Sequence, residues 1–177
     1  WRGPKEALVA AKLLEKERKG AALHDARLAI DTADAWRRAG DPRKAGDLLR
    51  AAMFGDPLHA NLGLGRVQMA SNQPGEAEQS FRAALAAWDK GAFGVDDQTD
   101  ARIGLARALV ARDPKNKEAA ATLDAAVRDD GGSAEAHYWL AKVSQEQGDR
   151  DKARAQADKA IDLDDAYPEA LALDGDL

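Results

Sequence analysis

The apolar residues between positions 133 and 170 recur with the period of two amphipathic helices separated by a short turn. The first predicted helix spans about residues 134–147, and the second begins at Arg150, after the Gly148-Asp149 turn. One face of each helix collects apolar positions, which are Leu140, Ala141 and Val143 in the first and Ala153, Ala157, Ala160 and Ile161 in the second. Such a pair cannot bury its apolar faces alone, so further copies are expected along the chain.

Alanines in equivalent positions mark five such second helices, and they are Ala7, Ala45, Ala77, Ala119 and Ala153. They lie 38, 32, 42 and 34 residues apart, which is a loose period near 34. The segment Gly40-Asp41-Pro42 predicts, in turn, a helix end, an N-cap and a first helical position. The predicted organisation is an orphan second helix at 4–19, helix pairs at 25–57, 58–99, 100–133 and 134–167, and the start of a further helix at 168–177.

Composition favours helices as well. Apolar residues make up 45 % of the 177 residues, but alanine supplies most of them and aromatic residues only 5 %. A sheet would need more β-branched and aromatic side chains, whereas an alanine-rich core suits helices that pack closely. The predicted fold class is therefore all-α.

The repeated unit resembles the tetratricopeptide repeat (TPR), whose pattern combines a leucine–glycine step, an alanine, a large residue and a second alanine. The pair at 58–99 matches best, with Leu64, Gly65, Ala77, Phe81 and Ala84, and Trp36 occupies the large-aromatic position of the pair before it. The resemblance implies a right-handed α-solenoid of antiparallel helix pairs forming one repeat domain over residues 1–177. Small residues such as Gly65 are expected to let helices approach closely, and large ones such as Phe81 to fill the space between them.

In the family, the first helices of the pairs line a concave groove that grips peptides or partner helices. The resemblance thus predicts a protein-binding scaffold or adaptor. The inward positions chosen for partner binding are Arg27, Ile30, Asp34, Arg37, Arg38, His59, Leu62, Arg66, Met69, Arg112, Tyr138 and Lys142. Arginine, methionine and tyrosine are favoured at interfaces, and guanidinium groups suit a carboxylate-bearing partner. The lysine and asparagine clamp of the family's chaperone-binding members is absent, because its positions hold residues such as Ile30, Asp34 and Arg66.

An insertion of about eight residues separates the third and fourth alanines and falls within residues 90–99. One interpretation is a long loop in which Phe93 and Val95 pack onto Trp88, at the end of an extended helix. The other is a binding loop, because long loops on repeat arrays often lie beside the ligand surface.

Candidate chemistry is sparse, and we expect no cofactor, no metal site and no enzymatic activity. The chain has no cysteine, and His24, His59 and His137 lie too far apart in sequence for a histidine pair at metal-binding spacing. The acidic residues Asp96, Asp97 and Asp100 lack the spacing of a calcium loop and suit a solvated loop or an N-cap better. No apolar run is long enough to cross a membrane. Nucleic-acid binding is not expected, because the net charge is −5 and the arginines lack interleaved aromatic residues.

Charge is distributed unevenly, since residues 1–57 hold 12 basic and 9 acidic residues and residues 134–177 hold 5 basic and 11 acidic ones. This asymmetry leaves open an alternative function, a structural or oligomerising segment whose opposite ends stack between copies. The chain starts without methionine and ends within the pattern, which indicates a piece of a longer protein. Missing targeting signals therefore say little; a cytoplasmic location is expected, with the periplasm as the alternative. The alanine- and arginine-rich composition fits a bacterial source loosely.

Overall fold

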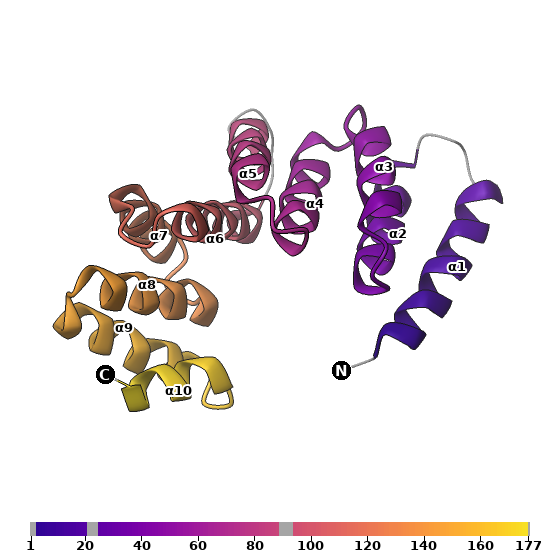
Figure 1. Cartoon of the computed structure of the whole chain (residues 1–177). Helices are drawn as coiled ribbons and strands as arrows, with labels where there is room; N and C mark the ends of the chain where they lie inside the picture. The colour runs from indigo at the N-terminus through magenta and orange to yellow at the C-terminus, as the bar shows by residue number, and fades with distance from the viewer. Residues whose placement is uncertain (1–2, 21–24, 89–93, 177) are drawn as a thin grey trace. The chain divides into compact units, whose positions relative to one another are not determined.

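The computed structural model describes residues 3–20, 25–88 and 94–176 of the 177-residue chain. Over these ranges the secondary structure consists of ten α-helices, without a strand, so the all-α class is confirmed (Figure 1). The helices are α1 (Pro4–Gly20), α2 (Ala26–Arg38), α3 (Pro42–Ala52), α4 (Pro57–Ala70), α5 (Pro74–Trp88), α6 (Val95–Arg112), α7 (Lys117–Asp129), α8 (Ala134–Gln147), α9 (Arg150–Leu163) and α10 (Pro168–Asp176). They form two compact units, residues 1–91 with α1–α5 and residues 92–177 with α6–α10.

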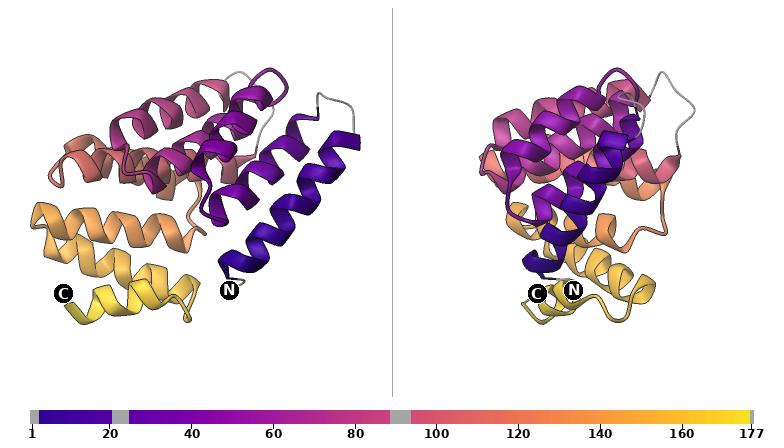
Figure 2. Two further views of the ribbon diagram at one scale, coloured as in Figure 1. Left: turned by 45° about the vertical axis from the view of Figure 1, so that its right-hand side comes forward. Right: turned by 90° about the vertical axis from the view of Figure 1, so that its right-hand side faces the viewer.

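Within each unit, every helix packs against the next one along the chain. Figure 2 shows this succession in the second unit, where α8, α9 and α10 lie side by side. The first helices of successive pairs also contact one another, because α2 touches α4, α6 touches α8, and α8 touches α10. Among the described helices, the backbones of the second helices α3 and α5, and those of α7 and α9, do not approach each other in this way. The first helices of a unit therefore share one face, which we call the first-helix face.

Helix boundaries are set by N-caps, of which Asp41 was predicted from the sequence and Asp149 lies in a predicted turn. Asp41 is the N-cap of α3, and its side-chain oxygen accepts a hydrogen bond of 3.1 Å from the backbone N–H of Lys44. Asp149 caps α9 in the same way through Lys152, also at 3.1 Å. Because Pro42 has no N–H to leave unsatisfied, it fits the first position of α3. The residues that mark the pair junctions in the sequence therefore satisfy backbone hydrogen-bond groups that helix ends leave free.

The turn inside three of the four helix pairs uses a residue in the left-handed backbone region. Gly40 and Gly148 have φ of 85°, and Asn72 has φ of 58° at the equivalent place between α4 and α5. Glycine adopts this conformation without steric cost, and asparagine tolerates it better than most residues. The left-handed residue ends the first helix and turns the chain back so that the second helix can pack against it.

Close approach between helices depends on two glycines of α4. A Cβ atom on Gly65 would lie 2.6 Å from Cε1 and Cζ of Phe81 in α5, and Phe81 is only 2 % exposed. On the other side of the helix, a Cβ atom on Gly63 would lie 2.5 Å from Cδ2 of Leu49 in α3. Both distances are far below van der Waals contact, so any larger residue must push the neighbour away. The packing role predicted for Gly65 and Phe81 is confirmed.

The key alanines of the four complete pairs are fully buried, and they are Ala45, Ala77, Ala119 and Ala153. The fifth alanine, Ala7, is only half-buried, because α1 contacts α2 and no other described helix. Trp36 joins α2 to its neighbours in the core of the first unit, where it clusters with Leu49 of α3 and Leu64 of α4. The small-and-large pattern of the sequence therefore corresponds to real contacts between helices.

The insertion within residues 90–99 differs from its prediction. We expected the first helix of the third pair to begin near Asp100, yet α6 begins at Val95. Asp96 and Asp97 occupy its first turn, where the helix dipole favours carboxylates. The longer spacing between alanines is thus taken up partly by extra helix. α5 does extend to Trp88 as predicted, but the packing of Phe93 and Val95 on Trp88 lies outside the described residues.

We expect Gly65→Ala to lower the free energy of unfolding by about 1–3 kcal/mol, because the added methyl group overlaps the buried ring of Phe81. Gly75→Ala is the matched control, since a Cβ atom there meets nothing within 4 Å and alanine favours the helix. Urea unfolding monitored by circular dichroism measures both variants. Equal stability of the two variants would contradict the packing described for α4 and α5.

Candidate functional site

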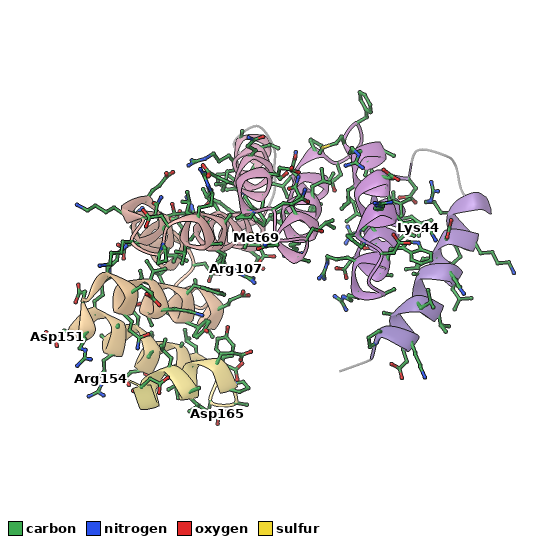
Figure 3. The ribbon with its side chains drawn as sticks, viewed as in Figure 1. Lys44, Met69, Arg107, Asp151, Arg154 and Asp165 are labelled. Carbon is green, nitrogen blue, oxygen red and sulfur yellow. The ribbon has the colours of Figure 1, made fainter. Side chains whose placement is uncertain are left out.

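The first-helix face of the second unit carries a tryptophan flanked by two cations. Trp139, in α8, is half-buried. The guanidinium carbon of Arg107, from α6, lies 4.8 Å from the centroid of its ring, and the ammonium nitrogen of Lys142 lies 5.1 Å away. Both distances are within the range of cation–π attraction. Figure 3 labels Arg107 on α6, so the cluster joins neighbouring first helices.

Glu135 connects the members of this cluster. It lies one turn before Trp139, and the indole N–H of Trp139 donates a hydrogen bond of 3.3 Å to its Oε1 atom. The same oxygen is 3.7 Å from Nη1 of Arg107. Both charged side chains are nearly half exposed, 43 % for Arg107 and 48 % for Glu135, so this ion pair adds little stability by itself. Its effect is to hold the indole and the guanidinium in one arrangement.

Tyr138 supports the tryptophan and connects it to a second tyrosine, Tyr167. Tyr138 contacts the rings of Trp139 and Tyr167 edge to face, each at 5.3 Å between ring centroids. Burial raises the pKa of the Tyr167 phenol above its ordinary value, and the carboxylates of Glu135 and Glu169 add to the shift. We call Arg107, Glu135, Trp139, Lys142 and Tyr167 the aromatic–cationic cluster.

Several other charges of the second unit hold helices together. Arg102 of α6 donates hydrogen bonds to the side chain of Asp129 and to the backbone carbonyl of Ala125, both in α7. The hydrogen bond from Arg102 lowers the pKa of the Asp129 carboxyl below its ordinary value. Lys152 of α9 likewise lies 2.8 Å from Asp124 of α7. These ion pairs join helices and are distinct from the aromatic–cationic cluster.

In the first unit, Asp34 compensates much of the positive charge that the sequence places on α2. It accepts a hydrogen bond of 2.6 Å from Arg37, and its second oxygen lies 2.7 Å from Nε of Arg38. Arg27 is exposed near the start of the helix, whereas Ile30 is half-buried and packs against the core. The α2 face is thus less basic than a count of its arginines indicates.

Of the partner-binding positions predicted on α4, the structure contradicts Leu62. It is only 3 % exposed, because α4 packs against α2, α3 and α5, and its side chain offers almost no surface to a partner. His59 is half-buried, and its Nδ1 atom lies 2.8 Å from the N-cap residue Asp56. Arg66 is exposed, and Met69, labelled in Figure 3, is half-buried. Partner binding by these residues stays a prediction.

In the second unit, the structure also contradicts the partner-binding role predicted for Tyr138. Its side chain is only 9 % exposed and supports the cluster from within the core. Arg112 is exposed in the last turn of α6, and Lys142 belongs to the cluster. The sequence prediction missed Trp139, Arg107 and Tyr167 as surface partners. The adjacent aromatic pair at 138–139 in a chain poor in aromatic residues was the available signal, but only the contact between α6 and α8 reveals Arg107.

Among the described residues, no group of three or more histidine, aspartate or glutamate side chains could hold a metal ion. His137 illustrates the roles that histidines take here. It is buried, with Nδ1 2.7 Å from the Gln156 side chain and Nε2 3.3 Å from the carbonyl oxygen of Gly131. None of the described helices has the length and apolar character needed to cross a membrane.

Comparison with known proteins supports the predicted family resemblance. The family model for the tetratricopeptide repeat matches residues 134–167, the helix pair formed by α8 and α9. Residues 134–167 are therefore a tetratricopeptide repeat, and the resemblance of the chain to proteins of this type is confirmed. No curated protein matches the chain in sequence.

Solved structures extend the likeness beyond this repeat. TTC0263, a thermophilic TPR protein of Thermus thermophilus, has a TM-score of 0.68 at 21 % identity, covering 85 % of this chain and 80 % of that one. MamA from Desulfovibrio magneticus RS-1 has a TM-score of 0.68 at 18 % identity, with coverage of 93 % and 87 %. Another MamA structure has a TM-score of 0.66 at 24 % identity, with coverage of 81 % and 80 %. At these identities the likeness shows the fold alone.

We expect Tyr138→Ala to lower the free energy of unfolding by about 3–5 kcal/mol, because it empties a buried aromatic site between α8 and α10. Lys142→Ala, one turn further along α8, should change it by no more than about 1 kcal/mol, since only a cation–π contact between two half-buried side chains is lost. Thermal unfolding of both variants measures the difference. Comparable losses in the two variants would show that the core and surface roles are assigned wrongly.

Proposed function

We propose that the chain is a non-catalytic scaffold that binds a partner protein or peptide on its first-helix faces. The observation that carries the proposal is the aromatic–cationic cluster, in which Trp139 stands half-exposed between Arg107 and Lys142. Tryptophan, tyrosine and arginine are the residues that most often dominate the energy of protein interfaces. The TPR fold supports the proposal, because it stacks helix pairs that present such surfaces.

The cluster is suited to binding because it is held in place before a partner arrives. The hydrogen bond to Glu135 fixes the indole of Trp139, and Tyr138 supports the ring from the core. A side chain that is already ordered loses less conformational entropy on binding. Arg107 and Lys142 together carry one positive charge more than Glu135 compensates, so a partner with a carboxylate beside an apolar side chain fits this surface.

A second candidate function is self-association as a structural segment, and exposed apolar side chains favour it. Val9 and Leu13 lie one turn apart on α1, and each is 59 % exposed, while Leu171 is exposed on α10. If these side chains pair between copies, analytical ultracentrifugation should show a larger species that Val9→Ser with Leu13→Ser removes. A monomer at every concentration tested would eliminate this candidate.

The scaffold proposal is tested by pull-down from the source organism with Trp139→Ala combined with Arg107→Glu. Loss of a hot spot of about 2 kcal/mol weakens binding roughly thirtyfold, so recovery of the native partner should fall by about that factor. Arg154→Glu is the charge-reversal control, because this exposed arginine lies on the second helix α9 (Figure 3). Arg37→Glu with Arg66→Glu tests the first-helix face of the first unit in the same assay.

Each outcome identifies a different surface. Loss with the first pair of substitutions alone assigns binding to the aromatic–cationic cluster, and loss with the second pair alone assigns it to α2 and α4. Undiminished recovery with both pairs would mean that the first-helix faces do not bind the partner. Circular dichroism of each variant verifies that the fold is retained.

A further inference from the structure

The first unit contains a groove between α1 and α2, away from the aromatic–cationic cluster that carries the proposed function. Its volume is about 450 Å³, and it opens to solvent along the two helices. The α1 side is formed by positions 6, 7, 10 and 14, and the α2 side by positions 31, 34, 35 and 38. These spacings are one face of each helix, so the groove follows the helices for about two turns. α1 contacts no other described helix, which leaves the groove uncovered by the described chain.

The floor of this groove is apolar and made of small side chains. Ala7, Ala10 and Leu14 line it from α1, and Ala35 lines it from α2. Ala10 is exposed, while Ala7 and Leu14 are half-buried. Because alanines project only a methyl group, the side chains of another segment can reach the floor and bury apolar surface there. An apolar floor of this kind contributes affinity but does not discriminate between ligands of different charge.

The rim of the groove is acidic and favours positively charged groups of a ligand. Glu6 from α1 and Asp31 from α2 are exposed, and neither forms an ion pair with any residue that the structure describes. Asp34 also lines the groove, but it is shared by Arg37 and Arg38. Among the lining residues that the structure describes, Arg38 is the single basic one, and its side chain is 66 % exposed. The described part of the lining therefore holds three carboxylates against one guanidinium.

We propose that the groove between α1 and α2 binds a short segment of a partner protein in which lysine or arginine flanks small apolar side chains. The apolar side chains lie on Ala7, Ala10, Leu14 and Ala35, and the cationic groups reach Glu6 and Asp31. Charge complementarity of this kind selects the partner and speeds its encounter more than it adds affinity. This site is independent of the aromatic–cationic cluster, whose charge favours the opposite kind of partner.

The proposal is tested with a phage-displayed library of random peptides of about twelve residues, enough for roughly three helical turns. Peptides are selected on the full chain and counter-selected on the Ala10→Trp variant, in which the indole fills the groove. Ala86→Trp is the matched control, because Ala86 is an exposed helical alanine on α5. Circular dichroism verifies that both tryptophan variants keep the fold. We expect selected peptides to carry lysine or arginine on both sides of alanine, valine or leucine.

Fluorescence anisotropy then measures the affinity of a selected peptide for charge variants. Glu6→Gln with Asp31→Asn should weaken binding about tenfold at low salt, since two unpaired carboxylates are removed. Asp151→Asn with Asp158→Asn removes the same charge from α9 and should leave the affinity unchanged; Figure 3 shows Asp151 on the outside of that helix. Trp139→Ala should also leave it unchanged, which separates this site from the proposed function.

Three results would overturn the proposal. The first is no enrichment of any peptide on the full chain over Ala10→Trp, and the second is enrichment of acidic or uncharged peptides. The third is an equal loss of affinity in the groove and α9 charge variants, which would mean that only net charge attracts the peptide. None of these results bears on the pull-down with Trp139→Ala and Arg107→Glu, so the two proposals fail independently.

Discussion

The close approach of neighbouring helices at positions without bulky side chains is the constraint on which this structure depends. α4 contacts α3 and α5 through Gly63 and Gly65, where even a methyl group would overlap a neighbouring side chain. The same role falls to the buried alanines of the second helices. Because each helix is held so close to the next, the large residues Trp36 and Phe81 fill the remaining space. Packing is thereby satisfied locally, between neighbours in sequence, as expected of a repeat protein.

This local packing has a consequence for function. Within a unit the first helices touch one another and share a face, while the backbones of the second helices α3 and α5, and of α7 and α9, stay further apart. Side chains from successive first helices can therefore combine, as Arg107 of α6 and Trp139 of α8 do. The core beneath them is made by the helix pairs. Tyr138 links the core to the first-helix face, since it is buried yet contacts the ring of Trp139.

The summed charge of a chain segment does not give the charge of the surface that the segment forms. Residues 1–57 carry more basic than acidic residues, and the arginines among the inward positions predicted a carboxylate-bearing partner. In the structure, Arg37 and Arg38 share Asp34, and the unpaired carboxylates of Glu6 and Asp31 face the groove between α1 and α2. The acidic segment 134–177 shows the reverse, because its α8 helix contributes Lys142 to a cluster with excess positive charge. Local pairing, and not the sum over a segment, sets the potential that a partner meets.

The sequence alone determined the helices, their order and the alanines that pack between them. These features depend on local properties: the period of the apolar residues, the caps at Asp41 and Asp149, and the left-handed turns at Gly40 and Gly148. The early start of α6 was missed, because an inserted segment has no repeat to be aligned with. Only the tertiary structure decided which side chains are buried, as for Leu62, and which meet across helices, as for Arg107 and Trp139. Those facts depend on contacts between residues about thirty positions apart, which periodicity within a single helix does not specify.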